Sequence, residues 1–311
     1  MLEIAIMVEG QNGLNWPRWQ RLARAVEDLG FVGLYRSDHF TNANPPDKES
    51  LELWTSLTWL ASHTSRIEFG SLVTPVSFRH PALTARMAAA VDDLSHGRLW
   101  LGIGAGWQER EHQHFGFDLL DIPARFQRFE EGIQVIQRLL ASDEPVDFEG
   151  RYYHLEEALV LPRPQRPGGP PILIGGNGKQ RTLPLAARYA QEWNAVYLTA
   201  QKFKELSVHL DGLIAAAGRQ AQEVRRSMMT GVVYAGNETR LNEKVAARTK
   251  SQGTPEDLRR RGVVTGTPAQ AVQQLSELEE AGLQRVMLQW LELDDIDGLE
   301  SFAARVLTQL N

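Results

Sequence analysis

The chain has 311 residues, and its 33 lysines and arginines against 39 aspartates and glutamates give a formal net charge of -6. This acidic balance argues against a nucleic acid or an anionic membrane as the main partner and favours a small-molecule partner. The sequence contains no cysteine, which excludes disulfide bonds, thiolate metal ligands and thiol nucleophiles.

The length is compatible with one large domain, because α/β barrels with insertions often exceed the usual domain size. We therefore expect residues 1–311 to form a single domain. The N-terminus carries Glu3 and only a short apolar run over Ile4–Val8, so no signal peptide is predicted. Apolar runs long enough to span a membrane are missing from the sequence, and we expect a cytoplasmic protein.

Short β-rich runs alternate with longer stretches of helical periodicity, and this alternation is typical of βαβ units and a parallel sheet. The predicted strands are residues 2–8, 31–37, 67–73, 98–104, 171–175, 192–198, 227–234 and 285–291, and a helix follows each one. Eight such pairs predict an α/β fold of the (β/α)8 TIM-barrel type. The alternative is an open, doubly wound sheet.

Several predicted helices carry signals at their ends. The first ends at Gly30, and the third begins with Pro81 and ends at Gly97. The last complete unit begins with a capping box over Thr267–Gln270. The residues predicted to be buried are Trp19, Leu22, Ala23, Val26 and Leu29 in the first helix, and Leu83, Met87, Val91 and Leu94 in the third.

Two insertions interrupt the alternation of strands and helices. Residues 142–170 follow the fourth helix and contain a predicted hairpin around Val146–Tyr153, then a proline-rich run. Residues 235–262 follow the seventh strand and are strongly charged. Because such segments are commonly solvated, we expect a loop or lid there rather than a binding patch.

The segment Arg98–Phe115 runs an apolar strand into a glycine-rich turn and then into a polar helix start. Gly102, Gly104 and Gly106 allow positive φ angles and remove every Cβ, so that a flat ring or a phosphate could lie against the backbone. The same pattern fits a tight turn without a ligand. The spacing of the glycines differs from the dinucleotide-binding fingerprint, which argues against a Rossmann fold.

The ends of the strands supply acid–base candidates, because a barrel places its active site there. Asp38 and His39 follow the second strand; histidine titrates near neutral pH, and a carboxylate can fix its tautomer. Neighbouring residues on a strand point to opposite faces, however, so one of the two could face the site while the other is structural.

The run Gly175–Gly178 follows the fifth strand and precedes a helix, which predicts an anion site of backbone amides. It differs from a P-loop, because Gln180 stands where serine or threonine would bind magnesium. A metal site is not predicted from Glu109–His114, since its carboxylates and histidines lack ligand spacing and better suit the first turn of a helix.

Further segments stand in an order that can be compared with known families. They are Val73–Pro75, Arg79–Pro81, Asp92–Leu99, Gly102–Trp107, Glu111–Gly116, Arg125–Phe126, Phe148–Tyr153, Pro170–Gly176 and Glu192–Asn194. Together these segments resemble the bacterial luciferase-like superfamily, and most of all its coenzyme F420-dependent oxidoreductases. The resemblance covers nearly the whole chain.

The resemblance implies a (β/α)8 barrel, commonly a homodimer, that holds coenzyme F420 or, alternatively, FMN and acts on a small molecule. It places His39, in its segment with Asp38, beside the reactive ring as the catalytic pair. It also implies a non-prolyl cis peptide at Leu72–Val73. The implied cofactor-binding residues are Leu72, Val73, Thr74, Gly104, Gly106, Trp107, Gly175, Gly176, Asn177, Gly178 and Asn194.

The sequence departs from the pattern at Trp107, where the family's sugar-phosphate dehydrogenases carry a glutamate. This residue speaks against glucose-6-phosphate oxidation and for a flat or hydrophobic substrate. The leading hypothesis is hydride transfer from reduced F420 to an activated double bond, carbonyl or imine; the alternatives are an FMN-dependent monooxygenase and a cofactor-binding protein without turnover. A cationic groove would favour F420, and its candidates are Arg151, Arg163, Arg166 and Lys179.

Overall fold

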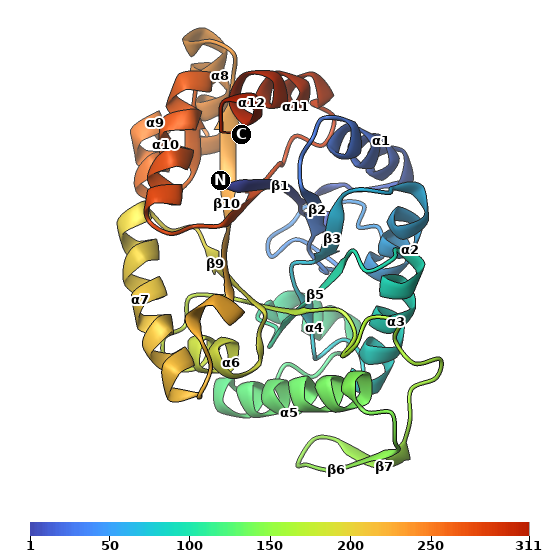
Figure 1. Ribbon diagram of the computed structural model, residues 1–311. Helices are drawn as coiled ribbons and strands as arrows, with labels where there is room; N and C mark the ends of the chain where they lie inside the picture. Colours follow the sequence, from blue (N-terminus) through green and yellow to red (C-terminus); the bar gives the residue numbers. More distant parts are fainter. Residues whose placement is uncertain (311) are drawn as a thin grey trace.

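The computed structural model describes residues 1–310, and in them eight parallel strands close into a barrel inside a ring of helices (Figure 1). The barrel strands are β1 (Glu3–Val8), β2 (Gly33–Arg36), β3 (Glu68–Ser71), β5 (Leu99–Gly104), β8 (Ile172–Gly175), β9 (Glu192–Val196), β10 (Arg225–Tyr234) and β12 (Arg285–Gln289). Because β1 pairs with β12 and β2, and β10 pairs with β9 and β12, the circuit is complete. The (β/α)8 prediction is confirmed, and the open sheet is excluded.

The helices around the barrel are α1 (Trp16–Asp28), α2 (Leu53–His63), α3 (Pro81–Leu94), α4 (Glu109–Phe115), α5 (Ile122–Ala141), α6 (Thr182–Tyr189), α7 (Ala200–Ala216), α10 (Pro268–Glu280) and α11 (Ile296–Phe302). Their predicted ends are confirmed: Gly30 and Gly97 have φ angles of +90° and +82°, and Thr267 forms a capping box with Gln270. Within residues 1–310, none of the helices combines the length and the apolar character that a membrane span requires.

The predicted buried face of α3 is wrong in part. Val91 is buried, but Leu83 and Leu94 are 50% and 45% exposed. The buried face consists mainly of small side chains, including Ala85 and Ala88. Helix α3 packs closely against both α2 and α5, so the inner face favours small residues, and the leucines lie outside it. In α1, the predicted face is buried except for Leu29, which is half-buried.

Strand alternation divides the core into two layers. In β1, Ile4 and Ile6 pack outward into the large core beneath the helices, whereas Ala5 and Met7 belong to a separate cluster inside the barrel. That inner cluster consists of Ala5, Met7, Tyr35, Leu72, Trp100, Leu173 and Met287. The same alternation brings Glu3 inward at the N-terminal end of the barrel and Glu9 inward at its C-terminal end.

The first insertion forms the predicted hairpin, which the structure extends. Strands β6 (Val146–Glu149) and β7 (His154–Ala158) pair antiparallel and project beside α5 (Figure 1). The hairpin lies outside the ring of helices, away from the barrel strands (Figure 1).

The second insertion corrects a prediction, because it is folded rather than a solvated loop. It contains α8 (Glu238–Thr249) and α9 (Pro255–Arg260), and the short β11 (Val264–Gly266) then pairs with β10. Its buried apolar residues are Ala235, Leu241, Val245 and Leu258, which pack with the flanking Val233 and Val263. The charged residues that suggested a loop occupy the outer faces of these helices.

Candidate active site

A cavity of 420 Å³ lies at the C-terminal ends of the barrel strands, where TIM-barrel enzymes place their active sites. Its volume falls within the range of about 300–1,000 Å³ that is usual for ligand pockets. The predicted residues that line it are His39, Leu72, Val73, Gly104, Gly106, Trp107, Gly175, Gly176 and Asn194. The cavity also contacts Glu9, Ser37, Pro75, Ala105, Glu111, Phe126, Val196 and Met229.

One wall of the cavity contains glycines at the ends of β5 and β8, and the Val73 side chain packs against two of them, Gly104 and Gly175. Gly106 and Gly176 have φ angles of +84° and +126°, conformations that L side chains rarely adopt. The Leu72–Val73 peptide bond beside this wall is cis, which confirms the prediction. We call Gly104, Gly106, Gly175 and Gly176 the glycine wall.

The expectation of positive φ angles at Gly102 and Gly104 is wrong, because both lie within the regular strand β5. These positions require glycine for a different reason. A Cβ at Gly102 would stand 1.9 Å from the backbone oxygen of Ser71, and one at Gly104 would stand 2.6 Å from Cγ2 of Val73. The close approach of β5 to the end of β3 therefore leaves no room for a Cβ at Gly102, and a Cβ at Gly104 requires the Val73 side chain to move.

His39 lies in the cavity and is paired with a carboxylate that the sequence prediction assigned elsewhere. Its Nδ1 is 2.9 Å from Oε1 of Glu111, and the other oxygen of Glu111 accepts a hydrogen bond from the Phe40 amide at 3.0 Å. The His39 side chain is 17% exposed and that of Glu111 only 1%. Since Nδ1 faces Glu111, Nε2 is the ring nitrogen that remains for a ligand.

Two opposing effects act on the pKa of His39. Burial disfavours the charged ring, but the hydrogen bond and the charge of Glu111 outweigh burial, with smaller contributions from the charges of Glu9 and Asp38. The pKa of His39 is therefore raised above its ordinary value. The pair is thus suited to hold a proton on the imidazole near neutral pH.

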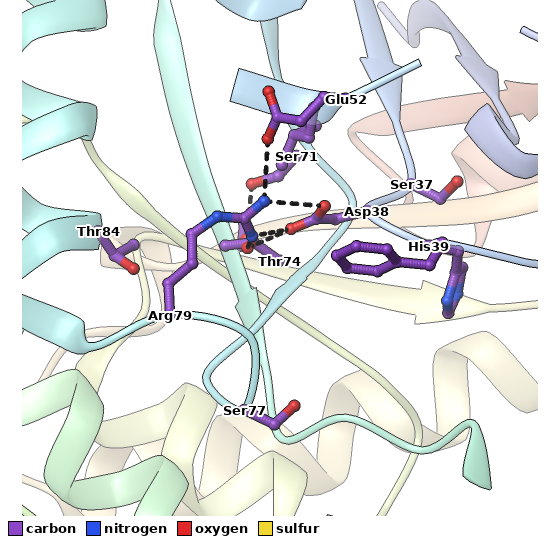
Figure 2. A network of polar contacts seen from close by, with 12 residues as sticks. Ser37, Asp38, His39, Glu52, Ser71, Thr74, Ser77, Arg79 and Thr84 are labelled. Atoms are coloured by element: carbon purple, nitrogen blue, oxygen red, sulfur yellow. Dashed lines mark hydrogen bonds and ion pairs between the residues drawn. The ribbon is translucent and has the colours of Figure 1, made fainter. Parts of the chain in front are cut away.

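Asp38 points away from the cavity and does not bond to His39 (Figure 2). Its carboxylate accepts hydrogen bonds from the Thr74 hydroxyl at 2.6 Å and from the Arg79 guanidinium. Arg79 also donates to Glu52 at 3.0 Å, and Glu52 caps the N-terminus of α2. Asp38 and Thr74 thus brace the strand ends, and strand alternation explains why His39 alone faces the site.

The loop Gly175–Gly178 only partly reaches the cavity. Asn177 donates to the carbonyl of Val196 at 2.7 Å and accepts from its amide at 2.9 Å, which fastens the loop to β9. A Cβ at Gly178 would stand 2.9 Å from Oγ1 of Thr182, the first residue of α6. Asn177 and Gly178 therefore lie outside the cavity lining and shape the loop, and a phosphate at this loop stays a prediction.

A polar wall lies opposite the glycine wall; Glu9 and Gln11 directly follow the first strand, at the end where the active site is expected, but their hydrogen-bond network was not predicted from the sequence. Its centre is Glu9, whose carboxylate accepts hydrogen bonds from Gln11 at 2.8 Å and from Gln289 at 2.6 Å. Ser37 in turn donates to Gln11 at 2.7 Å, and the Tyr197 hydroxyl donates to Gln289. We call Glu9, Gln11, Ser37, Tyr197 and Gln289 the Glu9 wall; Glu9 and Ser37 line the cavity, and the other three hold them from outside the lining. Strand alternation from Glu3 through Ala5 and Met7 was the available signal for Glu9.

Three of the four basic residues proposed for a cationic groove hold the first insertion instead, and the fourth, Lys179, is exposed on the loop before α6 and outside the cavity lining. Arg163 contacts Asp143 and the carbonyls of Leu139 and Leu140. Arg166 contacts Asp92 and the carbonyl of Gly97, and Arg151 contacts Gln127. None of these three arginines lines the cavity. The residues described include no group of three or more histidines and carboxylates able to hold a metal ion.

Comparisons with known proteins agree with this geometry. The family model described as luciferase-like monooxygenase matches residues 3–253. An F420-dependent glucose-6-phosphate dehydrogenase of Amycolatopsis mediterranei (strain U-32) is 27% identical over 317 residues, 92% of each chain. An F420-dependent hydroxymycolic acid dehydrogenase of Mycobacterium tuberculosis is 32% identical over 228 residues, 73% of this chain and 60% of the relative. The structure of an F420-dependent secondary alcohol dehydrogenase, solved with an F420-acetone adduct, shares the fold with a TM-score of 0.85, 17% identity and 98% coverage of each chain.

Proposed function

This chain belongs to the luciferase-like monooxygenase family, and from that premise we propose that it is an oxidoreductase that transfers hydride between coenzyme F420 and a small organic substrate. The observation that carries the proposal is the cavity in which the glycine wall faces the His39–Glu111 pair. The named dependence of the relatives on F420 supports the choice of cofactor.

The residues of the cavity fit a flat ring. Val73, whose side chain packs over Gly104 and Gly175, would hold one face of the ring, and the absence of side chains at the glycine wall leaves room for this packing. The cis Leu72–Val73 segment supplies the apolar contact on this side. When bound, the cofactor supplies the hydride chemistry, and the protein supplies position and electrostatics.

His39 is the residue that we propose to act on the reacting partner. Glu111 holds Nδ1 and favours the protonated ring, so Nε2 presents a proton to an oxygen or nitrogen in the cavity. Trp107, which is 61% exposed, stands edge-on to His39 with 5.6 Å between the ring centroids and forms the mouth. Together with Phe126 and Met229, it favours a hydrophobic substrate with an activated double bond, carbonyl or imine.

The proposal is tested by titrating the purified protein with F420 and with FMN under identical conditions. We expect tighter binding of F420 and anaerobic oxidation of reduced F420 by a panel of activated quinones, nitroaromatics and imines. Tighter binding of FMN, with product formation that requires oxygen, would establish the monooxygenase alternative. Binding of F420 without turnover on any acceptor would point to a binding protein instead.

We also propose that the chain forms a homodimer and acts in the cytoplasm. Leu83 and Leu94 on α3 are apolar and half-exposed, as the face of an interface would be. Light scattering after size exclusion should give twice the chain mass of 34.9 kDa. A monomer at micromolar concentration would contradict the dimer, and fractionation of cells checks the location.

A further inference from the structure

The Glu9 wall places a carboxylate in the cavity whose hydrogen-bond partners are all donors. Oε1 of Glu9 accepts from Nε2 of Gln289, and Oε2 accepts from Nε2 of Gln11. Two NH2 donors on one carboxyl group stabilise its negative charge. The arrangement therefore selects the ionised carboxylate.

The surrounding hydrogen bonds fix this polarity. Ser37 accepts from the Gly10 amide at 2.9 Å, so its own hydrogen goes to Oε1 of Gln11. The Tyr197 hydroxyl likewise donates to Oε1 of Gln289. With their oxygens occupied by hydroxyl donors, both glutamines turn their NH2 groups to Glu9. Each oxygen of Glu9 still has a lone pair for a donor inside the cavity.

Among residues 1–310, Glu9 forms hydrogen bonds to neutral amides and no ion pair, although its charge acts on the buried guanidinium of Arg36 and on His39. His39 is the only basic side chain among the described residues that line the cavity, and Glu111 neutralises it. Arg36 lies behind the wall, where its buried guanidinium donates to Ser56 at 2.6 Å and to the carbonyl of Leu51. Arg36 thus binds the loop before α2 and does not line the cavity.

We infer that Glu9 determines substrate charge, and that the cavity takes a substrate with a protonated nitrogen, an ammonium or iminium group. An apolar cavity that combines one carboxylate with an exposed aromatic ring, here Glu9 with Trp107, suits an organic cation. This inference rests on the proposed function only for the reaction that follows binding. A substrate carboxylate or phosphate at this position would be repelled.

The test is binding of three probes of similar shape to the protein without cofactor: benzylammonium, benzyl alcohol and benzoate, at low ionic strength by titration calorimetry. We expect the wild type to bind benzylammonium about 10- to 100-fold more tightly than benzyl alcohol, and benzoate weakest. Glu9→Gln should abolish this preference, and Glu9→Asp, which keeps the charge, should retain part of it. Circular dichroism confirms that each variant is folded.

Glu109→Gln is the matched control, because it removes the same charge from an exposed position beside Trp107 that lies outside the cavity lining. It should leave the preference unchanged. Equal binding of the three probes to wild type, or a preference that survives Glu9→Gln, overturns the inference. The wild type and all variants are also titrated with F420. A wild type that binds F420 but does not distinguish the three probes refutes only the charge role, whereas a wild type that distinguishes the probes but does not bind F420 refutes only the proposed function.

Discussion

The two ends of the barrel use the same strand alternation for opposite purposes. At the N-terminal end, Arg285 forms ion pairs with Glu3 and Glu68, so inward charges of opposite sign meet. At the C-terminal end, the inward positions are glycines or acidic and basic groups, such as Glu9 and His39, that keep capacity for a ligand. The comparison teaches that the two ends differ in the partners of their inward carboxylates: at the N-terminal end they meet the cation of Arg285, whereas Glu9 at the C-terminal end meets neutral amide donors.

The N-terminal network is extensive because several strands begin with a charged inward residue. Arg285 is 1% exposed and donates to Tyr35 at 2.7 Å and to Glu192 at 3.3 Å. Burial raises the pKa of Glu192, although the charge of Arg285 opposes the shift. Trp100 covers the guanidinium of Arg285, with 5.4 Å from its carbon to the ring centroid. Arg285 is therefore the central cation of the network at the N-terminal end of the barrel, and we call it the hub of this network.

The strongest test of the functional end is His39→Asn. We expect turnover of reduced F420 with an acceptor to fall by about 10²–10⁴-fold, because the proton donor is lost, while F420 affinity changes only a few-fold. Stopped-flow absorbance at several pH values measures the rate. Wild-type turnover on chemically different acceptors would remove His39 from the mechanism.

Asp38→Asn is the neighbouring control. Asp38 contacts Thr74 and Arg79 and does not line the cavity, so the free energy of unfolding should fall more than turnover does. A loss of turnover equal to that of His39→Asn, without loss of stability, would show that the two residues act as one catalytic unit after all.

At the structural end, Arg285→Met should have the largest effect on folding. Removing the hub leaves three carboxylates, those of Glu3, Glu68 and Glu192, close together without this cation, so we expect a loss of about 3–5 kcal/mol in the free energy of unfolding. Urea denaturation measures the loss, and F420 affinity of the remaining folded protein should be unchanged. A loss below about 1 kcal/mol would mean that the network contributes no net stability.

Two glycines of strand β5, two residues apart, allow a structural position to be compared with a position at the cavity. In Gly102→Ala the new Cβ meets the backbone of Ser71, which cannot easily move, so stability should fall by about 1–3 kcal/mol. In Gly104→Ala the Cβ meets Cγ2 of Val73, which can shift into the cavity, so F420 binding should weaken by roughly tenfold with less loss of stability. Urea denaturation and F420 titration measure the two effects. If one variant lost more than the other in both stability and F420 affinity, this distinction would be contradicted.

Much of the fold could be predicted because local signals agree with it. Strand periodicity, Gly30, Pro81 and the capping box at Thr267 identify the βαβ units, and eight units close a barrel. The signals failed at α3, where neighbouring helices decide which face is buried, and in residues 235–262, where charged outer faces concealed a small core.

The site was predictable only residue by residue. The glycines and His39 directly follow predicted strands, and the C-terminal ends of barrel strands are where active sites lie. Glu111 was interpreted only as a carboxylate in the first turn of a helix. Its contact with His39 was missed because the two residues are 72 positions apart in the sequence. Glu9 depends on Gln289, which is 280 positions away. Sequence spacing does not reveal such pairs, because the closing of the barrel brings them together.

The mildest prediction concerns the pH dependence of the His39–Glu111 pair. In Glu111→Gln the charge that raises the pKa of His39 is removed while burial remains, so the pKa of His39 should fall relative to wild type. NMR titration of the His39 ring, assigned by comparison with His39→Asn, measures this directly. An unchanged pKa would show that Glu111 only positions the ring.

The sign of the stability effect follows from linkage. The folded pKa of His39 lies above its unfolded value of about 6.5, so its contribution is fully present below that pH and is lost as pH rises through the folded pKa. The difference in the free energy of unfolding between wild type and Glu111→Gln should therefore be largest near pH 6. In alkaline buffer this difference should be smaller by about 1 kcal/mol. Urea denaturation across this range measures the difference. A difference that increases with pH would mean that the ring is neutral in the folded protein, and that the functional end holds its histidine as an acceptor rather than a proton donor.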